Sequence, residues 1–264
     1  MDAHAPKDVA AELAFQATQA AQVEMRATPL DIIDRYRHCR RWRLYRKEYV
    51  FKLIHQCRPK KILDFGCGSG DSSTELAALG YDVVGIDVSP ELIALAEERA
   101  RLDGVVDRAK FMAVDGTTAT LPAAAFDLVL VQAVLHHVDL AESLRTLEHV
   151  LAPGGHIIIV EPVAYSRTLQ WLRDRSPVEK DISPNERQLN KNDIRQIAGT
   201  FPIVEIRHFT IFQRLLRLIK VEGPLYDWPA RFLAIVDYLL LCIPGMGHLA
   251  STVVLLGRKP EAKS

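Results

Sequence analysis

A glycine-rich stretch, Asp64-Phe65-Gly66-Cys67-Gly68-Ser69-Gly70, decides the fold of this chain of 264 residues. It follows an apolar run at 61–65 that predicts a buried strand, and it precedes a helical pattern at 71–79 that Gly80 is placed to end. Glycines between a strand and a helix let the backbone turn tightly and approach a ligand, while the helix start offers unpaired N–H groups. The stretch therefore predicts the ligand-binding loop of an α/β domain.

The spacing of these glycines narrows the choice of ligand. A dinucleotide fingerprint needs glycine at 66, 68 and 71, whereas here the third glycine is Gly70 and residue 71 is aspartate. No phosphate-binding lysine of the P-loop type follows the loop, which argues against a nucleoside triphosphate.

Carboxylates follow three successive predicted strands. Asp87 ends the second strand, where a carboxylate accepts both hydroxyls of a ribose. Asp115 and Gly116 follow the third strand, where an adenine edge would lie, and Asp64 at the start of the loop suits a cationic amine. Ribose, adenine and an ammonium group without a phosphate site describe S-adenosylmethionine better than NAD.

The wider pattern predicts the architecture. Strands and helices alternate from 61 to about 161, and the predicted strands at 128–131 and 156–160 are very apolar, as in a parallel sheet covered by helices on both faces. Ser89 is predicted to cap a helix with Pro90 at its first position, and a helix over 140–151 is predicted to stop at 153–155. We expect a doubly wound α/β fold with a mostly parallel sheet. The predicted strands are 61–65, 82–86, 110–114, 128–131, 156–160, 203–209 and 251–256.

The chain is expected to divide into an N-terminal arm and helical cap at 1–57 and a ligand-binding domain at 58–264, with inserts at 162–190 and 212–246. Residues 31–61 hold eleven Lys or Arg against three acids. Aromatic residues recur there at helical spacing, which fits the buried face of a helix, a lid over the ligand or an RNA-binding surface. The members of this stripe are Trp42, Tyr45, Tyr49 and Leu53.

The insert at 212–246 is unusually apolar. Its first part predicts a basic amphipathic helix over 212–219, and a second apolar helix is expected from about Pro229 to Cys242. Such a pair could lie on a membrane surface, roof an apolar acceptor pocket, or simply cover the sheet.

Composition excludes other classes of protein. Lys and Arg total 33, as do Asp and Glu, so no overall charge favours nucleic acid. The four cysteines are scattered without zinc-ligand spacing, so no metal site is expected and a reducing compartment fits. The first residues lack the pattern of a signal peptide, and we expect a cytoplasmic protein, with peripheral contact at the inner face of a membrane as one option.

Four motifs in order resemble those of the class I S-adenosylmethionine-dependent methyltransferases. They are Leu63 to Gly70, Gly85-Ile86-Asp87-Val88-Ser89, Phe126-Asp127-Leu128-Val129-Leu130-Val131-Gln132, and Leu151-Ala152-Pro153-Gly154-Gly155. Leu135-His136-His137 and Glu161-Pro162 further resemble the small-molecule branch that includes the ubiquinone and menaquinone C-methyltransferases.

The resemblance implies a Rossmann-like methyltransferase fold and a set of residues that bind S-adenosylmethionine. Asp64 and the loop backbone would lie around the methionine part, Asp87 at the ribose, Asp115 and Gly116 at the adenine, and Gln132 beside the sulfonium. The implied cofactor-binding residues are Asp64, Gly66, Gly68, Gly70, Asp87, Val88, Asp115, Gly116 and Gln132.

The expected activity is methyl transfer to a small, apolar or lipid-like acceptor. The chain lacks the motifs of DNA amino methyltransferases, RNA cytosine methyltransferases and protein arginine methyltransferases. His136 and His137 follow the fourth strand, where an imidazole can accept a proton, and His137 is the favoured catalytic residue. The alternatives are that these histidines only pack or cap, that the protein binds the cofactor without turnover, or that it is an aminopropyl transferase.

Overall fold

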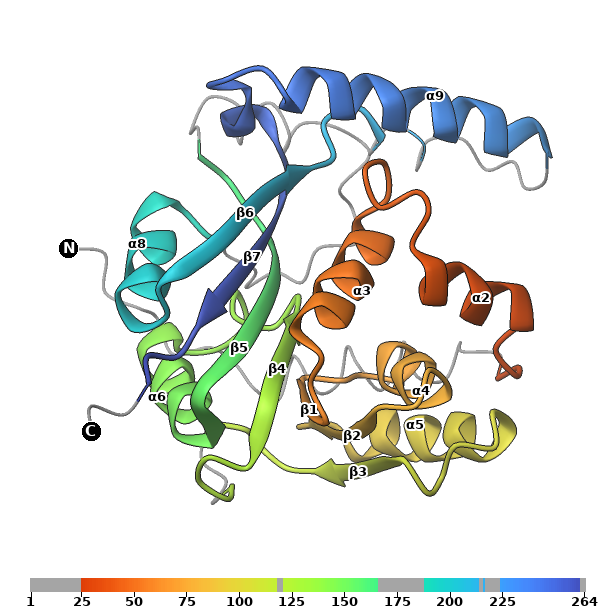
Figure 1. Ribbon diagram of the computed structural model, residues 1–264, viewed down its shortest axis with the longest axis vertical. Helices are drawn as coiled ribbons and strands as arrows, with labels where there is room; N and C mark the ends of the chain where they lie inside the picture. The colour runs from red at the N-terminus through yellow and green to blue at the C-terminus, as the bar shows by residue number, and fades with distance from the viewer. Residues whose placement is uncertain (1–24, 118–120, 166–187, 214–215, 217–223, 262–264) are drawn as a thin grey trace.

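The computed structural model describes residues 25–117, 121–165, 188–213, 216 and 224–261. A seven-stranded sheet with the order β3-β2-β1-β4-β5-β7-β6 forms its centre (Figure 1). β7 is antiparallel to both neighbours and the other pairs are parallel. This confirms the predicted doubly wound, mostly parallel sheet. The strands are β1 (Lys61–Phe65), β2 (Asp82–Asp87), β3 (Ala109–Ala113), β4 (Phe126–Gln132), β5 (Leu151–Pro162), β6 (Ile203–Phe209) and β7 (Thr252–Arg258).

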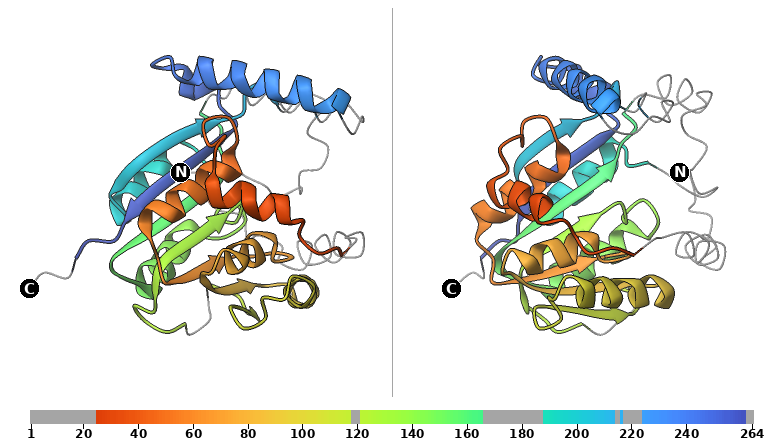
Figure 2. Two further views of the ribbon diagram at one scale, coloured as in Figure 1. Left: turned by 45° about the vertical axis from the view of Figure 1, so that its right-hand side comes forward. Right: turned by 90° about the vertical axis from the view of Figure 1, so that its right-hand side faces the viewer.

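Helices cover both faces of the sheet. On one face α2 (Leu30–His38), α3 (Arg46–Cys57), α4 (Asp71–Ala78) and α5 (Pro90–Leu102) share a core with the strands. On the other face α6 (Leu140–Val150) and α8 (Lys191–Thr200) form a second core. The helix α9 (Pro224–Leu241) and the short η3 (Met246–Leu249) lie beyond the end of β6, so α9 crosses one end of the sheet (Figures 1 and 2).

The apolar strands behave as their sequence predicts. Residues 128–131 of β4 and 157–160 of β5 are buried, with successive side chains alternating between the two cores. A strand buried on both faces cannot carry polar side chains at low cost, which explains the continuous apolar runs. The cap of α5 is also confirmed, because the Ser89 hydroxyl accepts the Leu92 N–H at 3.2 Å.

One predicted boundary is wrong. Helix α6 ends at Val150, and the Pro-Gly-Gly at 153–155 lies inside β5 rather than in a loop that stops the helix. Gly154 N–H donates to the Lys259 carbonyl, and Lys259 N–H donates to the Gly155 carbonyl. These bonds satisfy the backbone of an irregular strand start, where the ladder with β4 also shifts register.

The predicted helices around the core differ at their starts. The aromatic stripe is not one helix, since α3 begins at Arg46 and Trp42 lies in the turn before it. The apolar helix begins at Pro224, with Pro229 inside it. The predicted amphipathic helix at 212–219 falls largely outside the described residues, as do the arm at 1–24 and the helix expected near 169–175.

Candidate functional site

The glycine loop joins β1 to α4 with three left-handed residues. Gly66, Gly68 and Gly70 have φ of 75°, 53° and 78°, which glycine adopts without strain. The N–H groups at 66 and 67 both donate to the Ile86 carbonyl at 2.8 and 2.9 Å, which fixes the loop against β2. A Cβ at position 70 would stand 2.7 Å from that of Ala96, so the loop and α5 pack too closely for a side chain.

Asp87 ends β2 and holds the loop from the other side. Its Oδ2 accepts the Gly68 N–H at 2.9 Å and its Oδ1 accepts the Ser89 N–H at 3.0 Å. Each carboxylate oxygen can accept a further hydrogen bond, so the group can still receive two hydroxyls. Asp87 is 8% exposed, at the carboxyl edge of the sheet where the sequence predicts it.

Asp64 lies at the end of β1 and is 2% exposed. Its Oδ2 accepts the Ser73 hydroxyl at 2.6 Å. The pKa of Asp64 is raised to about 6, chiefly by burial and to a smaller extent by the charges of Asp87 and Asp71, while the Ser73 bond and the charge of Lys47 oppose the shift. An anion this poorly solvated gains from a nearby cation, which is the chemistry of an ammonium or sulfonium ligand.

The remaining predicted cofactor residues follow the neighbouring strands. Gln132 at the end of β4 donates from Nε2 to the Ser72 hydroxyl at 2.9 Å and so joins β4 to α4. Asp115 beyond β3 is exposed and accepts the N–H and hydroxyl of Thr117. A Cβ on Gly116 would overlap the Phe65 ring, so only glycine lets that backbone approach β1.

These observations bring the predicted residues together. Strands β3, β2, β1 and β4 are consecutive neighbours, and every predicted cofactor residue lies at or just beyond the carboxyl end of one of them or in the glycine loop. Val88 is exposed beside Asp87. In open α/β sheets this edge is where ligands bind.

A buried acid–imidazole pair joins the loop after β4 to the end of β5. His136 is 5% exposed, and its Nδ1 lies 2.7 Å from Oε2 of Glu161, which is fully buried. The other oxygen of Glu161 accepts the N–H groups of Val134 and Leu135, both at 2.8 Å. The ring of His137 is less buried and lies 3.9 Å from that of His136, centroid to centroid.

Sequence reasoning did not assign a role to Glu161. The available signal was its position, a carboxylate directly after the apolar residues of a strand buried on both faces. A buried carboxylate needs hydrogen-bond partners. The loop after β4 supplies three, two backbone N–H groups and the His136 ring.

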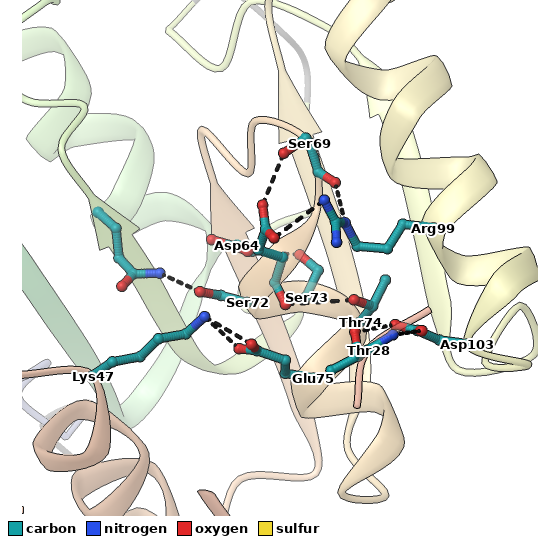
Figure 3. A network of polar contacts seen from close by, with 12 residues as sticks. Thr28, Lys47, Asp64, Ser69, Ser72, Ser73, Thr74, Glu75, Arg99 and Asp103 are labelled. Carbon is teal, nitrogen blue, oxygen red and sulfur yellow. Dashed lines mark hydrogen bonds and ion pairs between the residues drawn. The ribbon is translucent and has the colours of Figure 1, made fainter. Parts of the chain in front are cut away.

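The N-terminal segment is bonded to the end of α5, the helix whose Arg99 in turn contacts the glycine loop (Figure 3). Arg99 on α5 donates from Nε to the Ser69 carbonyl at 3.1 Å and forms an ion pair with Asp71. Thr28 donates its N–H and hydroxyl to Asp103 at the end of α5, at 2.6 and 2.7 Å. These contacts connect the residues just before α2 with α5, and through Arg99 with the glycine loop.

A second set of contacts anchors α3. The Lys47 ammonium lies 2.8 and 2.6 Å from the two oxygens of Glu75 on α4, and burial raises the pKa of that carboxyl group. Tyr49 is fully buried and packs against Phe209 of β6, with ring centroids 5.4 Å apart. The aromatic stripe therefore belongs to the core on this face, which is the packing interpretation of the sequence.

Comparison with known proteins identifies the central segment. Residues 63–159 match the family model described as a methyltransferase domain. Ajmaline N-methyltransferase of Rauvolfia serpentina is 33% identical over 50% of this chain and 43% of its own length. Demethylmenaquinone methyltransferase of Thermus thermophilus is 35% identical over 46% of this chain and 54% of its own. The chain thus spans about half the length of these curated relatives.

A solved structure of an S-adenosylmethionine-dependent methyltransferase from Methanosarcina mazei shares the fold. Its TM-score is 0.57 at 23% identity, covering 80% of this chain and 98% of that protein. The family match spans the glycine loop, Asp87, Gln132 and both histidines, all of which lie at the ligand edge of the sheet. Residues 63–159 of this chain are therefore a class I, S-adenosylmethionine-dependent methyltransferase domain.

Proposed function

We propose that this protein transfers a methyl group from S-adenosylmethionine to a small, apolar, lipid-like acceptor. One observation carries the proposal: Asp64, the glycine loop and Asp87 form one bonded unit at the ligand edge of the sheet. The domain match and a relative named for demethylmenaquinone support the reaction and the acceptor class.

The residues at this edge fit the parts of the cofactor. Asp87 would accept the ribose hydroxyls, and Asp64 would lie on the side of the cationic methionine part. Asp115 and Gly116 follow β3 at the adenine side, and Gln132 ends β4 beside the reacting centre. When bound, S-adenosylmethionine supplies a methyl group already activated on a sulfonium.

The protein then has to hold the acceptor in line and exclude water. Where the acceptor must lose a proton, a base is needed as well. We assign that role to His137, since His136 is held by Glu161 and is less exposed. Glu161 then acts as a positioning residue, because it fixes the backbone of the loop that carries both histidines.

Helix α9 supports contact with an apolar phase. Its exposed side chains recur along one face, and Trp228 stacks on Phe232 with centroids 5.8 Å apart. No helix among the described residues is long and apolar enough to cross a bilayer. A surface of this kind lies in the membrane interface, and we propose peripheral binding there as the route to a lipid-like acceptor. The exposed members are Trp228, Phe232, Ile235 and Leu239.

Flotation with anionic liposomes tests the membrane contact. We expect the protein to float, and Phe232→Asp to stay in solution. Leu102→Asp, at the exposed end of α5, is the matched control and should float like the wild type. Equal flotation of Phe232→Asp and the wild type would exclude α9 as the contact.

Calorimetric titration tests the cofactor. S-adenosylmethionine and S-adenosylhomocysteine should bind, NAD should not, and Asp87→Asn should weaken both adenosyl ligands by about tenfold or more. Asp107→Asn, an exposed change beyond α5, should leave affinity unchanged. Binding of NAD alone would refute the proposal, and cofactor binding without methyl transfer to any metabolite or lipid extract would favour a non-catalytic role.

A further inference from the structure

A cavity lies apart from the glycine loop, on the face of the sheet that α3 covers. Its volume is about 130 Å³, and the end of β6, helix α9 and the loop before α3 form its walls. Sites for whole small-molecule ligands run to about 300 Å³ or more, so this one fits a single functional group. The polar side chains among its lining residues include Arg43, Arg207, Thr210, Gln213 and Tyr238.

The cavity opens at the same edge of the sheet as the methyltransferase site. His208 on β6 is in register with Val253 on β7, which is in register with Glu161 on β5. Two strand spacings of about 4.8 Å each therefore separate β6 from β5 at this level. The cavity lies beside the catalytic edge and is not part of the glycine loop region.

Aromatic rings hold the guanidinium of Arg207 in place. Its Cζ lies 4.8 Å from the ring centroids of both Tyr49 and Phe209, 5.1 Å from that of Trp42 and 5.5 Å from that of Tyr238. One nitrogen donates to the carbonyl of Arg43. Stacked rings favour a fixed guanidinium whose remaining N–H groups keep a defined direction.

Two acids lie near these cations: Asp237 is one of the lining residues, and the charge of Glu205 acts on Arg207. Within the described ranges, no carboxylate lies at ion-pair distance from Arg207 or Arg43. Lys52 adds a third cation, with its Nζ 4.0 Å from the Trp42 ring. A guanidinium with unused donors in a concave, partly buried site is the recognition group for a carboxylate or phosphate.

The two nearby acids already have partners. Glu205 accepts the hydroxyl of Tyr49. Asp237 is buried, and its two oxygens accept the N–H groups of residues 211, 212 and 213 at 2.8 to 3.1 Å. Neither carboxylate therefore replaces an external anion at Arg207.

We propose that this cavity binds the oxyanion group of an amphiphile, a phosphate or a carboxylate, with Arg207 and Arg43 as donors. The apolar part of the amphiphile would lie against Ala234 and Leu241 of α9, which line the cavity beside the two arginines. The inference concerns binding alone and does not depend on methyl transfer.

Calorimetric titration with octyl phosphate, octanol and inorganic phosphate tests the proposal. Octyl phosphate should bind at one site, octanol should not saturate, and inorganic phosphate should bind more weakly than octyl phosphate. Arg207→Met should weaken octyl phosphate by about 10- to 100-fold, and Arg207→Lys by less, because it keeps the charge but loses the planar fork.

Two further variants at exposed positions distinguish loss of the binding site from loss of the folded structure. Arg43→Gln changes an exposed side chain, and we expect it to weaken octyl phosphate at least several-fold without loss of structure. Arg108→Gln removes an exposed cation paired with Asp82 and should leave affinity unchanged. Equal loss in Arg108→Gln and Arg43→Gln, or saturable binding of octanol, would overturn the site. Equal affinity for inorganic phosphate and octyl phosphate would show that the octyl chain adds nothing to binding, and would overturn the proposal that the ligand is an amphiphile.

Discussion

Asp64→Asn should stabilise the protein without ligand, and the gain should grow with pH. The folded environment raises the pKa of Asp64 from its ordinary 3.8 to about 6, chiefly by burial. The folded state therefore favours the neutral acid. The contribution of this group to stability is fully present below pH 3.8, falls as the pH rises toward 6, and is absent above that. At 1.36 kcal/mol per pKa unit, ionised Asp64 costs the folded protein about 3 kcal/mol near neutral pH.

Asparagine removes this cost while keeping an oxygen that accepts the Ser73 hydroxyl. Urea denaturation from pH 4 to 8 should show the variant gaining about 2–3 kcal/mol on the wild type across the range. Asp107→Asn, an exposed change, controls for the general effect of removing a carboxylate. The reasoning would be refuted if the free energies of unfolding of Asp64→Asn and the wild type changed with pH in parallel. It would also be refuted if the variant were the less stable of the two at pH 8.

The same carboxylate should matter in the opposite direction for the ligand. A cation beside Asp64 favours the ionised form, so S-adenosylmethionine should bind the wild type more tightly as pH rises through about 6. Calorimetry at pH 5 and pH 7.5 should show this gain in the wild type and not in Asp64→Asn. A group retained at the expense of folding stability is typical of a functional site.

Gly70→Ala should lower the free energy of unfolding by about 2–4 kcal/mol, because a left-handed residue and a Cβ 2.7 Å from that of Ala96 both cost energy. Gly68 has a φ of 53° and no atom within 4 Å of an added Cβ, so Gly68→Ala should lower the free energy of unfolding by only about 1–2 kcal/mol. Equal losses for the two variants in urea denaturation would contradict the packing argument. Asp237→Ala should cost about 2 kcal/mol or more and speed amide hydrogen exchange in the segment after β6, since three N–H groups lose their acceptor; unchanged exchange would count against it. Glu161→Gln should lower the turnover of methyl transfer by about tenfold and displace its pH profile while leaving cofactor affinity intact, and an unchanged profile would remove the positioning role.

The sequence was most informative where local chemistry and tertiary structure agree. The helix at 90–102 could be predicted because Ser89 and Pro90 carry their own capping information. The positions of Asp64 and Asp87 follow from short apolar strands that carry an aspartate at their carboxyl ends, which lie at a fixed edge of the sheet.

Features that depend on distant partners could not be predicted. The Pro-Gly-Gly at 153–155 has the local character of a helix stop, yet its backbone pairs with Lys259 and joins the sheet. The bond between His136 and Glu161 joins the loop after β4 to the end of β5, which only the fold brings together, and the rings around Arg207 come from α3, β6, α9 and a turn. Pairings of this kind leave no periodic pattern in one sequence.

The hydrogen bond between Tyr49 and Glu205 has a consequence for how this protein can be divided or recombined. The segment that aligns with other methyltransferases, 63–159, holds only β1 to β5, whereas α3, β6 and β7 complete the core around it. A chimera that exchanges the part of the chain after residue 159 would therefore have to take the N-terminal helices with it. The unit of sequence similarity and the unit of folding are different pieces of this chain, and only the larger one can be moved between scaffolds.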